Sequence, residues 1–364
     1  MTELMTKLGG RSYPIIIRRG LLDGLGGELR RFSRGSKVFV VTDENVNAHY
    51  GAKVEKSLQQ AGYITGSLVL PAGESTKSFA NVPVIYDALL DFGLTRRDML
   101  LTLGGGVVGD VGGFAASTYM RGVAYVQVPT SLLAQIDSSV GGKVAVNHER
   151  GKNLIGSFYQ PTAVFIDPDA LITLPNRFFA DGMAEVIKTA CVKDARLWRL
   201  IGRLMTRAEM RSDMEKIITR CCQIKKEIVE ADELDNGERM ILNFGHTIGH
   251  AAEAVYRYER YTHGEAVAIG MSLITAHSEA LEMTAPGTTA ALREVLRAYD
   301  LPCELEEGAD GAALVSSISH DKKNIGASLY IVLLKEIGQG FVYETTLPFF
   351  HFLLPNGSDN GSDI

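Results

Sequence analysis

Short apolar runs rich in β-branched residues alternate with stretches of helical spacing through the first half of the chain. The runs occupy 37–43 (KVFVVTD), 66–73 (GSLVLPAG), 98–106 (DMLLTLGGG), 124–130 (AYVQVPT) and 163–168 (AVFIDP). Strands that alternate with helices are typical of βαβ units, which place parallel strands side by side in one sheet. The pattern therefore predicts an N-terminal α/β domain with a mainly parallel sheet.

Beyond about residue 175 the pattern changes to long stretches of helical spacing, at 178–195 and 212–232, with few β-branched clusters. These stretches predict a second, all-α domain. We expect the first domain to cover 1–174 and the second to cover 175–355. The last residues, 356–364, are polar and contain glycine, so we expect a mobile tail there.

The composition is that of a globular protein. The 364 residues are 46% hydrophobic and 22% charged, which allows two domains with a core each. No apolar run approaches the ~18 residues of a membrane-spanning helix, and the N-terminus lacks the apolar block of a signal peptide. We therefore expect a cytoplasmic location, no membrane attachment and, from four cysteines without a C-x-x-C pattern, reduced thiols. A net charge of −6 argues against nucleic-acid binding, although a local basic cluster could hold a small anion.

The glycine-rich stretch LGGGVVGDVGG, at 103–113, follows an apolar run and can open a helix. Bare backbone N–H groups in such a place can hold a pyrophosphate. Gly104, Gly106 and Gly109 spell G-x-G-x-x-G, but the dinucleotide motif follows the first strand and has an acidic residue about twenty positions later. Pro129 and Thr130 stand there instead. Tight packing of strand against helix explains the glycines equally well, so both interpretations stay open.

Lysines set in glycine-rich turns mark the segment 129–161. Lys143, Lys152 and Asn153 lie there with Asp137, among hydroxyl-bearing residues and glycines. A lysine ammonium can reach phosphate oxygens as a point charge. A solvated loop is the alternative, but Gly-Gly-Lys and Gly-Lys-Asn within ten residues favour an anion site.

Histidines next to glycines are candidates for a metal site. In NFGHTIGHA, at 243–251, His246 and His250 are four residues apart and share one helix face. The spacing resembles the helical H-E-x-x-H zinc motif without its glutamate. His263 in YTHGEAVAIG adds a third histidine next to a glycine.

A glutamate completes this candidate set. Glu185 and Lys188 of DGMAEVIKTA lie three apart on one helix face, where a surface ion pair is the ordinary explanation. Together with histidines, however, Glu185 can form a zinc site with one coordination position left open for water or substrate. One of the three histidines is then surplus to the metal.

Seven motifs in a fixed order make the chain resemble the 3-dehydroquinate synthases of the sugar phosphate cyclase family. They are GGGVVGD, QIDSSVGGK, GKNLIG, GMAEVIK, LNFGHTIGHA, HGEAVAIG and DKKN, in a match that runs from about residue 40 to 338. The resemblance implies a dehydroquinate synthase-like fold, with a Rossmann-like nucleotide-binding domain followed by a helical domain that binds metal and substrate.

The resemblance implies different roles for the two neighbouring histidines. Glu185, His246 and His263 match the zinc ligands of the family, with Co²⁺ as a substitute metal. His250 matches a residue that contacts the substrate near its phosphate. Three protein ligands leave a position for substrate hydroxyls, and the metal lowers the pKa of the hydroxyl to be oxidised.

NAD is the implied cofactor. The matching positions are Asp43, Asn45, Glu74, Lys77, Gly105, Gly106, Val107, Asp110, Thr130, Ser131, Asp137, Lys152 and Thr173. A carboxylate such as Glu74 beside the ribose hydroxyls would repel a 2′-phosphate, which favours NAD over NADP. Ser131 stands where the family has a threonine, so the hydroxyl is kept and only its packing differs.

The implied reaction converts 3-deoxy-D-arabino-heptulosonate 7-phosphate to 3-dehydroquinate and phosphate, in the shikimate pathway to aromatic amino acids. It is a lyase reaction with transient oxidation by NAD, phosphate elimination, re-reduction and aldol cyclisation. The positions matching the phosphate side are Lys143, Asn153, His250, Arg121 and one of Lys322 or Lys323. Those matching the carboxylate and ring hydroxyls are Lys188, Lys225, Arg239 and Asn243.

Arg121, in TYMRGVAYVQVP, matches a family position that reaches the phosphate bound by a neighbouring subunit. A homodimer with sites completed in trans is therefore implied, and an ordinary surface arginine is the alternative.

Other activities remain as alternatives. They are another sugar phosphate cyclase, a metal- and NAD-dependent polyol dehydrogenase of the glycerol dehydrogenase type, and a non-catalytic nucleotide-binding regulator. A dehydrogenase does not need the lysine-rich phosphate site, and a regulator does not need the zinc set. Arg239, with Lys225 and Asn243, argues against cyclases whose substrates lack a carboxylate.

Overall fold

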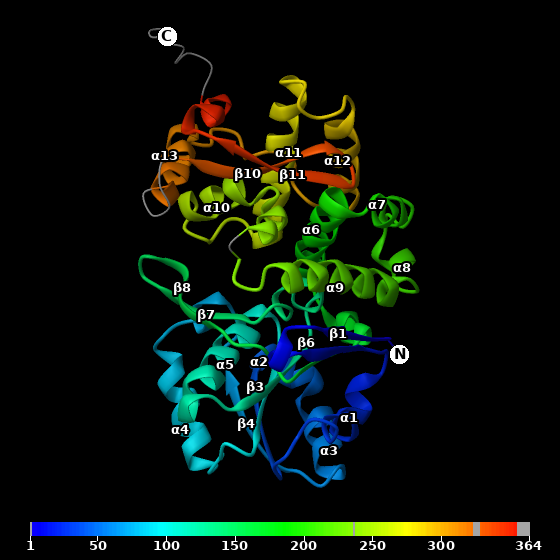
Figure 1. Cartoon of the computed structure of the whole chain (residues 1–364), viewed down its shortest axis with the longest axis vertical. Coiled ribbons are helices and arrows are strands. Elements are labelled where there is room, and N and C mark those ends of the chain that lie inside the picture. The colour runs from blue at the N-terminus through cyan, green and yellow to red at the C-terminus, as the bar shows by residue number, and fades with distance from the viewer. Residues whose placement is uncertain (1, 236, 323–327, 355–364) are drawn as a thin grey trace. The chain divides into compact units, whose positions relative to one another are not determined.

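The computed structural model describes residues 2–235, 237–322 and 328–354. The chain divides into two compact units (Figure 1): unit 1 comprises Met1–Phe179 and Ser212–Leu234, and unit 2 comprises Ala180–Arg211 and Asp235–Ile364. The predicted tail, 356–364, lies outside the described residues.

Unit 1 is built around a seven-stranded sheet with the order β1-β2-β9-β6-β5-β3-β4. The strands are β1 (Thr2–Thr6), β2 (Tyr13–Ile17), β3 (Lys37–Asp43), β4 (Ile64–Leu70), β5 (Met99–Gly104), β6 (Ala124–Pro129) and β9 (Ala163–Ile166). All neighbours are parallel except β1 and β2. The mainly parallel sheet is confirmed, and the five apolar runs of the sequence correspond to β3, β4, β5, β6 and β9.

Helices pack on both faces of this sheet, which explains the apolar character of its central strands. β5 is buried at every position, as expected for a parallel strand covered on both sides. One core contains residues of α1 (Leu25–Leu29) and α3 (Ala52–Gln60), and the other contains residues of α4 (Asn81–Asp91) and α5 (Gly106–Thr118). Alternate residues of β3 enter the two cores, as the period of a strand requires.

The strand order contains a switch point between β3 and β5. From β3 the chain moves outward to β4, then returns to β5 on the other side of β3 and continues to β6 and β9. In open α/β sheets, ligands bind at the carboxyl ends of the strands on the two sides of such a point. The glycine-rich stretch follows β5 and therefore lies at this place.

Antiparallel elements of unit 1 were not predicted. β1 extends the sheet at one edge, and β7 (Lys143–His148) pairs with β8 (Gly151–Phe158) in a hairpin where the sequence indicated turns. In β7 only Val144 and Val146 are buried. Two apolar positions are too few to mark a strand among the surrounding glycines and polar residues.

The helix α9 (Met214–Ala231) packs with unit 1, although it follows three helices of unit 2. Its Cys222 thiol donates a hydrogen bond to the Gln135 carbonyl at 3.2 Å, and its Glu230 carboxylate accepts one from the Lys7 backbone at 2.5 Å. A single division after residue 174 does not describe this arrangement. Apolar periodicity identifies a helix, but it does not identify the core against which the helix packs.

Unit 2 is mainly helical. Its helices are α6 (Asn176–Lys193), α7 (Ala195–Ile201), α8 (Arg207–Met210), α10 (His246–Val255), α11 (His263–Ala280), α12 (Thr288–Ala298) and α13 (Gly311–Lys322). An antiparallel pair, β10 (Leu329–Glu336) and β11 (Gln339–Thr345), is added to the helices that the sequence predicted. None of the helices in the described ranges has the length and hydropathy that crossing a membrane requires.

Candidate functional site

Glu185, His246 and His263 converge on one point in unit 2. Glu185, on α6, is 1% exposed, and its Oε1 lies 3.8 Å from Nε2 of His246 and 3.7 Å from Nε2 of His263. The three potential ligand atoms lie within 4.8 Å of one another. Ligand atoms about 2.0–2.1 Å from a tetrahedral zinc ion are roughly 3.3 Å apart. The observed spacing is therefore close to what a metal ion requires.

Both histidines are the first residues of their helices. His246 opens α10 directly after Gly245, whose φ of 80° lies in the left-handed region that favours glycine. His263 opens α11 after Thr262, whose hydroxyl accepts a hydrogen bond from the Glu265 backbone in a capping box. The sequence thus fixes the backbone at both helix starts.

Glycines allow these helix starts to come close to their neighbours. A Cβ at Gly270 would lie 2.0 Å from the carbonyl oxygen of Gly245. A Cβ at Gly264 would lie 2.1 Å from the carbonyl oxygen of Asp181 on α6. Since both obstacles are backbone atoms, the close contacts of α11 with α10 and α6 depend on these glycines.

The charge distribution favours a neutral His246. Lys188, one helical turn after Glu185, is buried and forms an ion pair with its carboxylate. Burial, and then the positive charge of Lys188, hold the pKa of His246 well below its usual value. The imidazole is then neutral at pH 7, and Nδ1–H can donate to the Phe244 carbonyl at 3.2 Å, leaving the Nε2 lone pair for a ligand.

These side chains fit a divalent metal ion. Apart from the ion pair with Lys188, the buried oxygens of Glu185 have no hydrogen-bond donor among the described residues. Lys188 satisfies only part of the acceptor capacity of this buried carboxylate, and a metal ion would bind the rest. One carboxylate and two imidazoles, with a coordination position left open, is a ligand set of catalytic zinc sites.

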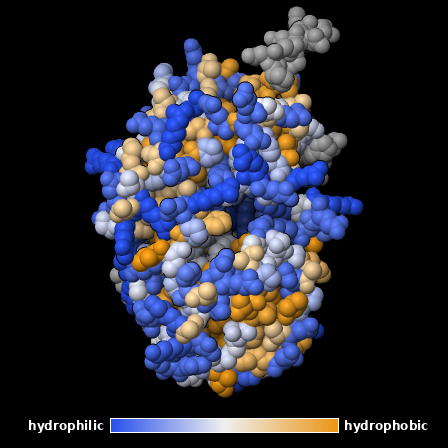
Figure 2. All heavy atoms as spheres, turned by 180° about the vertical axis from the view of Figure 1, so that it is seen from behind, coloured by the Kyte–Doolittle hydropathy of each residue, from blue (hydrophilic) through white to orange (hydrophobic). Residues whose placement is uncertain are grey.

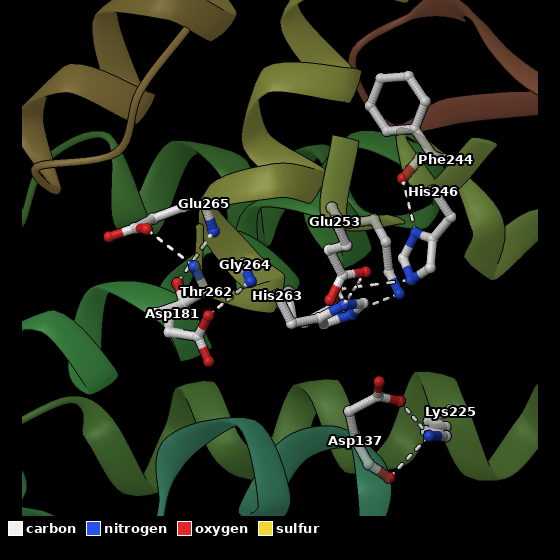
Figure 3. Close-up of polar contacts among 12 residues, drawn as sticks. Asp137, Asp181, Lys225, Phe244, His246, Glu253, Thr262, His263, Gly264 and Glu265 are labelled. Carbon is white, nitrogen blue, oxygen red and sulfur yellow. Dashed lines mark hydrogen bonds and ion pairs between the residues drawn. The ribbon is translucent and has the colours of Figure 1, made fainter. Parts of the chain in front are cut away.

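A second grouping of possible metal ligands also includes His263. His250, Glu253 and His263 also have potential ligand atoms within 4.8 Å of one another. Nδ1 of His263 faces Oε2 of Glu253 at 3.4 Å (Figure 3), while its Nε2 is the atom nearest to Glu185. One imidazole cannot bind a single ion through both nitrogens, so an ion held at Nε2 beside Glu185 leaves Nδ1 to face Glu253. Burial of Glu185 and the neutral His246 favour the first.

Two buried carboxylates near the candidate metal ligands were not singled out from the sequence. Glu253 contacts His263, and Asp181 accepts a hydrogen bond from the Gly264 backbone at 2.5 Å (Figure 3). Helical spacing could have indicated both, because Glu253 lies three residues after His250 and Asp181 four before Glu185.

In unit 1 the glycine-rich stretch forms a turn between β5 and α5. The Thr130 backbone donates to the Gly104 carbonyl at 3.0 Å, which joins the ends of β5 and β6. A Cβ at Gly105 would approach the Ser131 hydroxyl to 3.3 Å, and one at Gly106 would approach the Ser138 hydroxyl to 3.1 Å. Bare backbone, two hydroxyls and the start of a 13-residue helix therefore form a cradle that fits a pyrophosphate.

The alternative explanation, tight packing, applies to the later glycines of the same stretch. A Cβ at Gly109 would lie 2.8 Å from the Gln127 side chain, and one at Gly112 would lie 2.5 Å from the Thr102 methyl. Tight packing is therefore confirmed for Gly109 and Gly112, whereas pyrophosphate binding at Gly105 and Gly106 stays a prediction.

Charged side chains surround this cradle. Lys77 and Asp110 form an ion pair; burial raises the pKa of Asp110, and the charge of Lys77 opposes that rise. Glu74 accepts a hydrogen bond from the Asn147 side chain at 2.7 Å, and the Asn147 side-chain oxygen accepts one from the Asn153 backbone at 3.0 Å. Asn147, which was not singled out from the sequence, thus links a candidate cofactor residue with a candidate phosphate residue.

Asp137 and Lys225 form an ion pair between the turn Ala134–Ser138 and α9 (Figure 3). The Lys225 ammonium also donates to the Asp137 carbonyl at 2.6 Å. Lys143 is exposed at the start of β7, and Lys152 is half-buried on β8 beside Asn153. All five of the candidate residues from the lysine-rich segment and α9 therefore belong to unit 1.

The remaining cofactor candidates lie beside strand and helix ends of unit 1. Asp43 ends β3 and accepts a hydrogen bond from the Val46 backbone at 3.0 Å, as the cap of α2 (Glu44–Val46), which contains the exposed Asn45. Val107 lies in the first turn of α5. The Thr173 hydroxyl lies 2.6 Å from the Tyr50 hydroxyl.

The other substrate candidates differ in their exposure. Arg239 is buried and Asn243 is exposed, both in the 3-10 helix Glu238–Asn243 of unit 2. Arg121 is exposed in unit 1, at the end of the 3-10 turn Tyr119–Arg121 that precedes β6. Lys323 and the side chain of Lys322 lie outside the described residues.

Solved sugar phosphate cyclases share this fold. A 2-deoxy-scyllo-inosose synthase, complexed with carbaglucose-6-phosphate, NAD⁺ and Co²⁺, has a TM-score of 0.87 at 23% identity, covering 97% of this chain and 99% of that chain. The 2-epi-5-epi-valiolone synthase of Streptomyces hygroscopicus, with NAD⁺ and Zn²⁺ bound, has a TM-score of 0.86 at 26% identity, covering 97% and 98%.

The family within this class follows from the sequence comparisons. The models for the N-terminal and C-terminal parts of 3-dehydroquinate synthase match residues 67–181 and 182–324. The 3-dehydroquinate synthase of Clostridium beijerinckii is 52% identical over 350 residues, 96% of this chain and 100% of the relative. That of Clostridium botulinum is 53% identical over 351 residues, with the same coverage. The chain belongs to the 3-dehydroquinate synthase family.

Proposed function

We propose that this protein converts 3-deoxy-D-arabino-heptulosonate 7-phosphate to 3-dehydroquinate and phosphate, as a lyase that depends on NAD and zinc. The observation that carries the proposal is the convergence of Glu185, His246 and His263 beside the buried Lys188. It occurs in a chain 52% identical to a relative that bears the corresponding name. Unit 2 then supplies the metal centre, and unit 1 supplies the nucleotide site.

Bound NAD supplies a hydride acceptor and donor, and a bound divalent metal supplies a Lewis acid for the hydroxyl to be oxidised. Glu185, His246 and His263 hold the metal. We assign Zn²⁺, with Co²⁺ as a substitute, because carboxylate and imidazole ligands suit both ions. The lowered pKa of His246 keeps its Nε2 available at neutral pH.

The cradle at Gly105 and Gly106 binds the pyrophosphate of NAD through backbone N–H groups at the start of α5. Glu74, held by Asn147, accepts hydrogen bonds from ribose hydroxyls and repels a 2′-phosphate. Asp137, paired with Lys225, lies at the nicotinamide end. The other cofactor contacts are Asp43, Asn45, Lys77, Val107, Asp110, Thr130, Ser131, Lys152 and Thr173.

The two anionic groups of the substrate require separate sets of cations and hydrogen-bond donors. The phosphate is bound by Lys143, Asn153, His250 and one of Lys322 or Lys323. The carboxylate and ring hydroxyls are bound by Lys188, Lys225, Arg239 and Asn243. Fixing both ends of the substrate orients its reacting carbon atoms and prevents wrong ring closures.

The central test measures phosphate and NADH together. With the heptulosonate phosphate, NAD and Zn²⁺, we expect continuous phosphate release without accumulation of NADH, because the hydride returns to the substrate. Accumulation of NADH equal to the substrate consumed would instead indicate a polyol dehydrogenase. Turnover of a sugar phosphate without a carboxylate, at an equal or higher rate, would indicate another cyclase.

The buried Arg239 provides a test of substrate selection. Arg239→Ala should raise KM for the carboxylate-bearing substrate by roughly 10- to 100-fold, the range for a lost hydrogen bond to a charged group. Arg239→Lys should recover only part of this loss, because lysine cannot form the two parallel hydrogen bonds of a guanidinium. Steady-state kinetics check this, with Arg293→Ala on α12 as a control that leaves KM unchanged. An unaltered KM in folded Arg239→Ala would refute the assignment.

We also assign Arg121 to the phosphate site of a second subunit in a homodimer. Arg121 precedes β6, whereas the nucleotide cradle follows the carboxyl ends of β5 and β6. Six residues of strand separate these ends by roughly 20 Å, so the Arg121 side chain does not reach the nucleotide cradle of its own subunit.

The surface around Arg121 supports association. Met120, Leu154 and Phe158 are exposed to 38%, 62% and 40%. The Ser157 hydroxyl lies 3.0 Å from that of Ser117, so β8 lies near the turn that carries Arg121. Figure 2 shows apolar side chains gathered in one area of the surface of unit 1. Such exposure is typical of protein interfaces.

The proposed setting is the cytoplasm, with no nucleic-acid or membrane partner. The four cysteines are buried thiols, as expected in a reducing compartment. The net charge of −6 opposes binding to nucleic acid or to an anionic membrane surface.

A further inference from the structure

The Glu253 carboxylate contacts His263, a proposed metal ligand, at the ring nitrogen that points away from the proposed metal. Glu253 lies on α10 and is 3% exposed, and its Oε2 is 3.4 Å from Nδ1 of His263 (Figure 3). The opposite ring nitrogen, Nε2, is 3.7 Å from Oε1 of Glu185. The imidazole of His263 therefore lies between two buried carboxylates.

The two histidine ligands are oriented in comparable ways. His246 has the Phe244 carbonyl at Nδ1 and Glu185 near Nε2, and only 13% of its side chain is exposed. His263 is exposed to 31%, so burial alone constrains its ring less. A hydrogen-bond acceptor at Nδ1 fixes both the ring orientation and the tautomer, and leaves Nε2 as the ligand atom.

The backbone of His263 is fixed independently of its ring. Asp181 accepts a hydrogen bond from the Gly264 backbone at 2.5 Å, and the capping box of Thr262 and Glu265 closes the first turn of α11. These contacts fix the Cα position, but they do not determine which ring nitrogen points to Glu185. That choice depends on a side chain that faces the ring.

We propose that Glu253 is a positioning residue, which accepts the Nδ1–H of His263 and thereby directs Nε2 to the metal. The inference rests on the metal centre proposed above, with Glu185, His246 and His263 as ligands. It gives a role to a buried carboxylate that is not itself a ligand in that set. The competing possibility is that Glu253 binds the metal directly, with His250 and His263.

Metal affinity, measured without substrate, tests the role of Glu253. Metal-free protein is titrated with Zn²⁺ against a chromophoric chelator, and with Co²⁺ while its visible absorption is recorded. Glu253→Ala should weaken the Kd for Zn²⁺ by about 10- to 100-fold, the usual effect of removing a partner of a ligand. Glu253→Gln, which keeps an acceptor oxygen without the charge, should show a smaller loss. The Co²⁺ absorption bands should change in both variants.

Glu279→Gln is the matched control on the same helix as His263. Glu279 accepts hydrogen bonds from the backbones of Gly287 and Thr289 at 2.6 and 2.7 Å, near the end of α11. Its replacement should lower Tm and leave both the Kd for Zn²⁺ and the Co²⁺ spectrum unchanged. A general loss of stability is thereby distinguished from a loss of positioning.

A double-mutant cycle decides whether Glu253 acts through His263. In a His263→Ala background, Glu253→Ala should cause no further loss of Co²⁺ affinity. A wild-type Kd in folded Glu253→Ala would overturn the inference, and so would a full additional loss in the His263→Ala background. If the wild-type protein binds no metal, both the proposed metal centre and this inference are refuted. If it binds metal and replacement of Glu253 has no effect, only this inference is refuted.

Discussion

Replacing His246 by alanine is expected to remove the bound metal, whereas replacing His250 by alanine should leave the metal in place. His246 directs a neutral Nε2 toward Glu185, while His250 is exposed and its ring centroid lies 5.3 Å from that of His246. His250→Ala should lower kcat/KM by roughly 10- to 100-fold through the loss of a hydrogen bond to the phosphate. Metal analysis of the purified proteins by mass spectrometry, together with kinetics, measures both effects.

The opposite result would identify the other grouping of possible ligands as the metal site. If His250→Ala loses the metal and His246→Ala retains it, the ion is bound by His250, Glu253 and His263. Equal loss in both variants would refute the division of roles between the two histidines. His277→Ala is a suitable control, because His277, on α11, lies outside both groupings. Its ring stacks on that of Phe352, with the ring centroids 4.1 Å apart. It should retain both the metal and the activity.

The sheet could be predicted because its strands have a strong local signal. Parallel strands covered on both faces are apolar at nearly every position, as β5 shows, and helices separate them along the chain. The pair β7–β8 has no such signal, since only Val144 and Val146 of β7 are buried and no residue of β8 is. Its stability comes from partners that are not evident from a short window of sequence.

The packing of α9 shows the limit of periodicity. Its apolar face indicated a helix, and the structure confirms one at Met214–Ala231. The face packs against unit 1, however, through contacts with residues such as Gln135 and Asp137 that lie far away in the chain. Amphipathic spacing defines which side is buried, but the identity of the opposing surface is a tertiary property.

The chemistry of the candidate metal centre could partly be predicted from the sequence. Histidines and a glutamate in glycine-flanked contexts indicated a metal set, but choosing two of three histidines required the resemblance to a family. Glu253 and Asp181 were missed because a carboxylate within a helix usually lies at the surface. Only the fold shows that they are buried and face His263 and Gly264.

The role proposed for Arg121 depends on its position in the fold, which the residues next to it in the sequence do not indicate. Its φ of 66° and the φ of 110° at Gly122 turn the chain sharply before β6, at the edge of the sheet opposite the nucleotide cradle. A residue at this edge can complete a phosphate site through a second subunit. Arg121→Ala and Glu185→Ala homodimers should each be nearly inactive, the first lacking a phosphate ligand and the second lacking a metal ligand.

A mixed dimer of these two variants should recover about half of the wild-type activity per dimer, because an interface of two identical subunits exchanges the same residues in both directions. The subunit that retains Glu185 receives Arg121 from its partner, so one site is intact and the other carries both lesions. If Arg121 acted within its own subunit, each site would keep one lesion and verified heterodimers would stay inactive. Tagged copies purified through two affinity steps allow the measurement. Arg97→Ala, at another exposed arginine of unit 1, should be active as a homodimer and serves as the control. Verified heterodimers without recovered activity would refute the shared phosphate site.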